Sequence, residues 1–173
     1  MSDLLVQLTK RADGATVLRC VRADGSATWQ RQERQHARHF PLHDLAHYAI
    51  ETELAFCHGF YGLIAQGWDI EDTTGKGARG PLPPEALVVE YVVGALDVER
   101  AGGSEWSAED FNVQAANYCA ARGSPAPRPL TDADLARVRS RIAELHALWW
   151  ALPPGETLEL RYASAAAGHT VRP

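Results

Sequence analysis

The residues whose types and spacing could do chemistry are concentrated in the stretch FPLHDLAHYAIETELAFCHGF, residues 40–60. His43, His47 and Glu51 follow one another at intervals of four, so in an α-helix each step turns them by only about 40° around the axis. Two imidazoles and one carboxylate on one face form a donor set that Zn²⁺, Mn²⁺ or Fe²⁺ accepts. The spacing therefore predicts a divalent metal ion held by His43, His47 and Glu51, with zinc as the first choice and manganese or iron as alternatives.

Asp44 directly follows the first histidine of this pattern. A metal ion with an open coordination position lowers the pKa of a bound water toward neutrality, which makes that water a nucleophile. In HExxH metallohydrolases the residue after the first histidine is a glutamate that acts as general base, and HDLAH offers a shorter carboxylate in the same place. We therefore expect Asp44 to handle the proton of the water.

The element HDLAH, residues 43–47, resembles the HDxxH element of the metal-binding family of ubiquinone-biosynthesis proteins and, more loosely, the HExxH helix of the zincins. The resemblance covers only these few residues and implies a metal-binding helix. In the ubiquinone family a glutamate is expected twelve residues after the second histidine, where this sequence has Gly59 with His58 beside it. The longer stretch GFYGLIAQGWDIEDTTGKG is similar to small bacterial proteins.

Other side chains could complete or line such a site, and the sequence does not rank them. Glu53 lies within the apolar arc of the same helix and competes with Glu51 as the third ligand. Glu90 lies in the apolar run ALVVEYVVGAL, where a carboxylate needs a partner such as a metal ion or an arginine. The remaining candidates are His58, which returns to the sector of the histidine face, and His39, just before the helix. An inter-helical site would join His43, His47, Glu53 and Glu90.

The glycine-rich segment TTGKGARG, residues 73–80, follows the histidine stretch and could cover the site as a lid. Its backbone amides, together with Lys76 and Arg79, could hold an anionic group. The GxxxxGK[ST] pattern of a phosphate-binding loop is absent, and the alternative is a mobile loop without a ligand.

The elements that must position these residues are of two kinds. Segments 4–10, 16–22 and 27–32 have the composition of strands, and the Asp-Gly pairs between them predict tight hairpin turns. Segment 156–162 alternates in the same way and predicts a further strand. Helical patterns cover residues 42–66, 84–101, 108–122 and 132–152.

These elements predict an α+β fold in which a small antiparallel sheet, an N-terminal meander plus a C-terminal strand, packs against about four helices. Ser107 and Thr131 stand where two helices should begin, and Thr131 with Asp134 fits a capping box. The length of 173 residues suits one domain. We expect a meander in 1–33, a helical layer in 40–152, a strand in 156–163 and a loose tail in 164–173.

Composition narrows the classes of partner. The chain has 46% apolar and 23% charged residues, and its 22 acidic and 17 basic residues form no long run of one sign, which argues against a nucleic-acid-binding surface. Three widely spaced cysteines without a CxxC pair indicate a reduced cytoplasm, and the N-terminal segment does not read as a signal peptide. No apolar run is long enough for a transmembrane helix. We expect a small-molecule substrate or ligand, no nucleic-acid or membrane partner, and a chain that could form a homodimer.

Two functions follow from this sequence. The first is a metal-dependent enzyme of hydrolytic type that uses the histidine face. The alternative is a non-catalytic domain that binds a small molecule or a protein, in which the histidine helix is structural.

Overall fold

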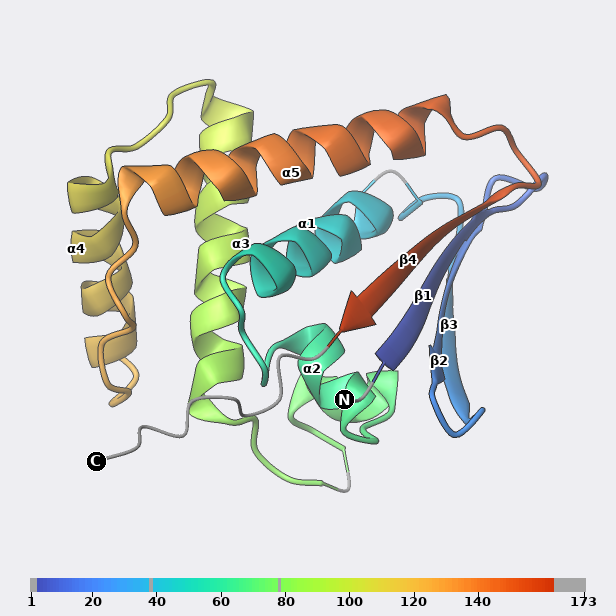
Figure 1. Ribbon diagram of the computed structural model, residues 1–173, viewed down its shortest axis with the longest axis horizontal. Helices are drawn as coiled ribbons and strands as arrows, with labels where there is room; N and C mark the ends of the chain where they lie inside the picture. Colours follow the sequence, from blue (N-terminus) through green and yellow to red (C-terminus); the bar gives the residue numbers. More distant parts are fainter. Residues whose placement is uncertain (1–2, 38, 78, 164–173) are drawn as a thin grey trace.

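The computed structural model describes residues 3–37, 39–77 and 79–163 (Figure 1). In these ranges a four-stranded antiparallel sheet packs against α-helices, which confirms the predicted α+β fold. The strands are β1 (Asp3–Lys10), β2 (Thr16–Arg22), β3 (Ala27–Gln32) and β4 (Thr157–Ala163). The helices are α1 (Phe40–Glu53), α2 (Phe60–Ala65), α3 (Pro84–Gly102), α4 (Ala108–Ala120) and α5 (Asp132–Ala151), with a short 3₁₀ helix η1 (Ile70–Thr74).

The sheet has the strand order β3-β2-β1-β4, in which β1, β2 and β3 form the predicted meander and the predicted late strand β4 pairs with β1. Gly14 and Gly25 occupy the two hairpin turns with φ of +84° and +85°, a conformation that residues with a Cβ rarely adopt. Alternate residues of β1 point into the core, while Gln7 on the opposite face bonds to Glu159 and Arg19. One face of the sheet is therefore buried, and it is the face that α1 covers.

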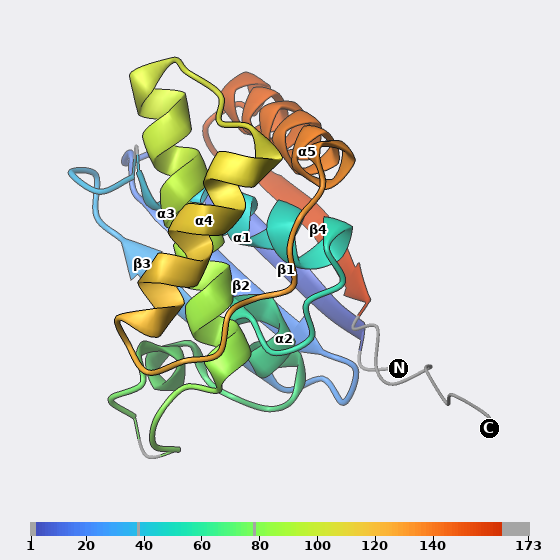
Figure 2. The same ribbon diagram turned by 90° about the vertical axis from the view of Figure 1, so that its left-hand side faces the viewer.

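Helix α1 is the central helix of the molecule. It packs against α5, α3 and the sheet, and α4 lies beyond α3 on the side away from the sheet (Figures 1 and 2). Ten of its fourteen residues are buried, and these include Asp44, His47 and Glu51. His47 and Glu51 are therefore enclosed by neighbouring elements, whereas His43, on the same face of α1, is partly exposed.

The prediction of one continuous helix over residues 42–66 is wrong, because α1 ends at Glu53 and α2 begins at Phe60. Ala55 adopts a left-handed backbone conformation with φ of 55°. The carboxylate of Glu85, on α3, accepts the backbone N–H groups of Cys57 and His58 in the connection. Glu85, which is distant in the sequence, thus stabilises the interruption between α1 and α2. As a result, His58 does not lie on the helix face that carries His43 and His47.

The remaining helices begin and end close to the predicted residues. Ser107 caps α4 through the backbone N–H of Asp110, and Thr131 forms the predicted capping box with Asp134 at the start of α5. No helix in the described ranges has both the length and the apolar character needed to cross a membrane. The predicted tail, 164–173, lies outside the described residues.

Candidate metal centre

His43 and His47 on α1 converge with Glu90 on α3. Each offers one donor atom, and these three atoms all lie within 4.8 Å of one another. Donors around an ion at metal–ligand distances of about 2.0–2.2 Å lie about 3–4 Å apart, so small side-chain rotations bring the three into a coordination geometry. We call these three residues the His43–His47–Glu90 triad.

His47 is the buried member of the triad, with 2% of its surface exposed. Its Nε2 lies 3.3 Å from Oε1 of Glu90, and its Nδ1 lies 3.5 Å from Oε1 of Glu51. Nδ1 makes no hydrogen bond of good geometry among the described residues, although water does not reach it. A metal-binding histidine characteristically directs its second ring nitrogen to a carboxylate, and His47 has this arrangement.

Glu51, predicted as the third ligand, lies on the opposite side of His47 from Glu90. Its two carboxylate oxygens accept the backbone N–H groups of Tyr61 and Gly62, at 3.2 Å and 3.0 Å, in the first turn of α2. Glu51 is therefore outside the triad, where it caps α2 and faces Nδ1 of His47.

The charges around His47 decide its protonation. Burial by itself would lower the pKa of His47, but the carboxylates of Glu51 and Glu90 raise it to about 10. Partial burial would raise the pKa of Glu90, and His47 and His43 reverse this effect so that the pKa is lowered. With a proton on His47 the group is a carboxylate–imidazolium–carboxylate arrangement, and a metal ion would have to replace that proton.

His43 and Glu90 lie on the solvent side of the triad, with side chains that are 28% and 44% exposed. Nδ1 of His43 is 3.8 Å from Oδ2 of Asp97, on the same helix as Glu90. The ring of the exposed residue His39 stacks on that of His43 at a centroid distance of 5.7 Å. His39 therefore borders the triad, and Asp97 faces Nδ1 of the His43 ring.

Asp44, predicted as the proton acceptor, is buried and is not part of the triad. Burial raises its pKa to about 6, and the nearby His43 and His47 oppose this effect. Its carboxylate makes no hydrogen bond among the described residues, and its charge also acts on Cys20 and Tyr61 on the core side of α1. A carboxyl group with this pKa can take up and release a proton near neutrality.

The structure places the other predicted candidates away from the triad. Glu53 pairs with Arg137 of α5 at 3.8 Å, and His58 pairs with Glu85 at 3.5 Å. The guanidinium of Arg79 bonds to the carbonyl oxygen of Gly67, lies over Trp68 and is 3.7 Å from Asp72. The side chain of Lys76 is exposed.

Sequence reasoning identified both histidines and named Glu90 among several carboxylates, and the packing of α3 on α1 selects Glu90. Sequence reasoning did not predict the ion pair between Glu99 and Arg139, which joins α3 to α5. Glu99 lies two residues after Asp97 on α3. A glutamate one turn before the end of an apolar helix was the only signal for that pair.

Comparison of the chain with protein-family models, with curated proteins and with solved structures finds no match in any of the three.

Proposed function

We propose that this protein binds one divalent transition-metal ion through His43, His47 and Glu90 and uses it in hydrolytic chemistry. The observation that carries the proposal is the convergence of the three donor atoms around buried His47, whose other ring nitrogen faces Glu51. Two imidazole nitrogens and one carboxylate oxygen suit Zn²⁺, Fe²⁺ or Mn²⁺. Three protein ligands leave at least one position open, which distinguishes a catalytic from a closed structural site.

The chemistry that such an ion supplies is a bound water with a pKa near neutrality. His43, His47 and Glu90 would hold the ion, and hydrolysis of a carbonyl compound would add the oxygen of the water to the carbonyl carbon while the leaving group departs with the proton of the water. Glu51 would hold His47 in one tautomer and orientation. Asp44, with a pKa raised to about 6, is the proposed carrier of the proton.

The competing interpretation is that His47 is a structural imidazolium held between two carboxylates. Measured metal content separates the two. Protein stripped with a chelator and titrated with Zn²⁺, Mn²⁺ or Fe²⁺ under anaerobic conditions should bind one ion per chain. The double variant His43→Ala, His47→Ala and the single variant Glu90→Gln should lose this binding.

His58→Ala is the matched control, because His58 is a histidine of the same segment that pairs with Glu85 away from the triad. It should bind metal like the wild type. Circular dichroism reports whether each variant keeps its helices. Equal metal binding by the wild type and the folded double variant would overturn the proposal.

A further inference from the structure

A partly open cavity of about 300 Å³ lies where α5 passes the C-terminal half of α3 (Figure 1). Its walls include Leu96 of α3 and Ile142 and Ala143 of α5, and residues 103–105 of the connection from α3 to α4 also line it. No member of the triad lines this cavity, so it is a separate feature of the molecule. We call it the α3–α5 cavity.

The cavity has the size and the surface of a site for a small organic molecule. Ligand pockets in proteins begin at about 300 Å³, and a dry apolar cavity of about 150 Å³ already binds benzene. The surface of the α3–α5 cavity is mostly apolar. Removing an apolar ring from water into this space is therefore favourable, and the volume is sufficient for a bicyclic aromatic ring.

The charged groups on the cavity wall are paired with one another. Arg139 donates to both carboxylate oxygens of buried Glu99, at 2.7 Å and 3.0 Å, and lies 3.8 Å from Glu105. Arg100 donates to Asp97 at 3.2 Å. A charged ligand of either sign would have to displace one of these partners, so the wall favours an uncharged ligand.

His146 contributes a hydrogen-bond acceptor to the wall. It is 8% exposed, and its Nε2 lies 3.0 Å from the carbonyl oxygen of Leu42. Because a carbonyl oxygen only accepts, Nε2 carries the hydrogen of this bond. Burial lowers the pKa of His146, so the ring is neutral at neutral pH and Nδ1 keeps a lone pair.

Nδ1 of His146 is unbonded but not sealed. Among the described residues the side-chain atoms that are both sealed from water and unbonded are Nδ1 of His47 and the hydroxyl oxygen of Tyr91, and Nδ1 of His146 is not one of them. It has no hydrogen-bond partner in the described part of the chain. Since His146 lines the cavity, a ligand there can donate a hydrogen bond to this nitrogen.

We propose that the α3–α5 cavity binds an uncharged, mainly apolar small molecule of the size of a bicyclic aromatic ring, which donates one N–H or O–H hydrogen bond to Nδ1 of His146. The ring would lie against Leu96 and Ile142. The site is additional to the metal centre and does not depend on it, because the two share no donor residue.

Indole is a suitable probe, because it is bicyclic and its one polar group is an N–H donor. Benzofuran has nearly the same shape but carries an oxygen that only accepts, which would face the lone pair of Nδ1. Binding to the whole metal-free chain at neutral pH is measured by ligand-observed NMR. Indole should bind at one site per chain with a Kd on the order of 1 mM or below, and benzofuran should bind about tenfold more weakly.

Three variants locate the bound probe. Ala143→Trp fills the cavity from an exposed wall position and should weaken indole binding at least about tenfold. Ala147→Trp is the matched control, because it places the same bulk on the exposed surface of α5 one turn further along, and it should bind indole like the wild type. His146→Phe keeps an aromatic ring without the acceptor, so it should bind indole no more tightly than benzofuran. Circular dichroism checks that each variant is folded.

The results decide each part of the proposal. Absence of saturable indole binding to the folded wild type, or binding that survives Ala143→Trp, would overturn the site. Equal affinities of the wild type for indole and benzofuran would overturn the role of His146.

Metal binding is tested separately from this site. The double variant His43→Ala, His47→Ala should bind indole like the wild type, and a loss of indole binding by the folded variant would contradict the independence of the two sites. A wild type that binds indole but no zinc would overturn the metal function alone. A wild type that binds zinc but no indole would overturn the cavity site alone.

Discussion

The carboxyl group of Glu51 occupies the space that a side chain at position 59 would need. A Cβ atom built on Gly59 would overlap Cδ of Glu51 and also approach Oε2 and Cγ closely. The φ angle of Gly59 is −77°, so the need for glycine comes from this close approach and not from backbone strain. The relationship links the break after α1 to the triad, because the same carboxylate caps α2 and faces His47.

Gly59→Ala should therefore displace Glu51 and weaken two kinds of contact of its carboxylate: the hydrogen bonds from the backbone of α2 and the contact with His47. We expect the free energy of unfolding to fall by about 2–3 kcal/mol, as for other overpacked sites, and zinc affinity to fall at least about tenfold. Urea unfolding and zinc titration measure the two effects. The matched control is Gly94→Ala on α3, where an added Cβ meets no atom within 4 Å and should not destabilise the helix. Equal behaviour of the two variants would contradict the prediction.

Glu51→Gln should weaken zinc binding without abolishing it. The amide preserves the shape of the side chain but removes the charge that faces Nδ1 of His47, and such changes lower metal affinity by roughly 10–100-fold. Glu90→Gln removes a direct ligand and should have the larger effect. Competition with a chromogenic zinc chelator measures both affinities, and an effect of Glu51→Gln equal to or larger than that of Glu90→Gln would favour Glu51 as the ligand.

Metal binding should release a proton from His47 at neutral and mildly alkaline pH. The pKa of His47 in the metal-free protein is raised to about 10 by Glu51 and Glu90, so the ring is protonated before the ion binds. Zinc affinity should then rise about tenfold for each pH unit between pH 7 and 9. Calorimetry in buffers of different ionisation enthalpy counts the protons, and binding without proton release would contradict the value for His47.

The raised pKa of His47 also determines how the stability of the metal-free protein changes with pH. The folded-state pKa of His47 lies above the ordinary value of 6.5. Its ion pairs therefore stabilise the fold fully below pH 6.5, and this contribution is lost as the pH rises through 10. His47→Gln should lack that alkaline loss in a series of urea unfolding curves. A wild-type stability that stays constant between pH 7 and 10 would argue against the imidazolium.

Asp44→Asn should stabilise the metal-free protein at pH 8. The folded-state pKa of Asp44 is about 6, above its ordinary value of 3.8, so burial favours the neutral form. The favourable contribution is fully present below pH 3.8 and lost as the pH rises through 6, and an asparagine does not undergo this loss. We expect a gain of about 2–3 kcal/mol at pH 8 and none at pH 4, from chemical denaturation. If Asp44 carries the proton in hydrolysis, the more stable variant should bind zinc normally and lose activity.

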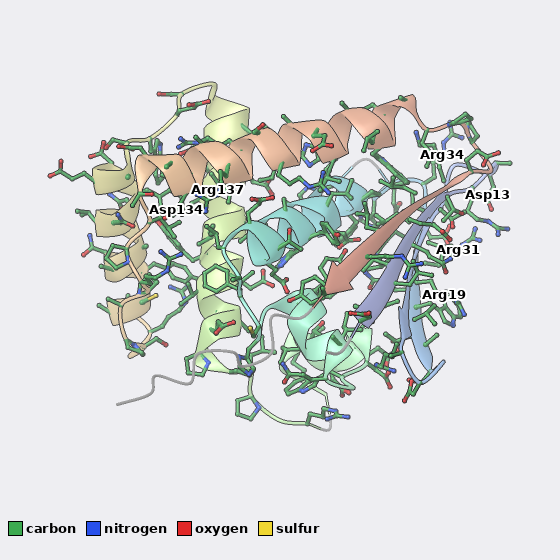
Figure 3. The ribbon with its side chains drawn as sticks, viewed as in Figure 1. Asp13, Arg19, Arg31, Arg34, Asp134 and Arg137 are labelled. Carbon is green, nitrogen blue, oxygen red and sulfur yellow. The ribbon has the colours of Figure 1, made fainter. Side chains whose placement is uncertain are left out.

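Asp134→Asn should weaken the start of α5 except in strong acid. Asp134 lies close to Arg137 in the first turns of α5, as Figure 3 shows, and it accepts the backbone N–H of Thr131. The backbone of Thr131, followed by Arg137, lowers its pKa from 3.8 to about 2. Its contribution is present above pH 3.8 and lost as the pH falls through 2. Thermal melting should show a loss of about 1 kcal/mol in the variant at pH 6, typical of a lost cap, and a smaller difference near pH 2.

The sequence by itself determined the features that depend on neighbours along the chain. The Asp-Gly hairpins, the alternation of the strands and the capping box at Thr131 are local, and each appears where the pattern places it. The spacing of His43 and His47 also follows from the helix period alone. The fold class and two of the three residues of the candidate site were therefore accessible before any tertiary contact was known.

The tertiary structure decided which carboxylate completes the triad. The periodicity of α1 places Glu51 one turn after His47, but it does not show which residue of another element faces the second ring nitrogen of His47. Glu85 stabilises the interruption after α1 by accepting a backbone N–H group of the connection. Helix α2 then folds back, and its backbone N–H groups donate hydrogen bonds to the carboxylate of Glu51. The packing of α3 then brings Glu90 to Nε2 of His47, the ring nitrogen that does not face Glu51. These contacts join residues far apart in the sequence, so no periodicity within α1 could reveal them.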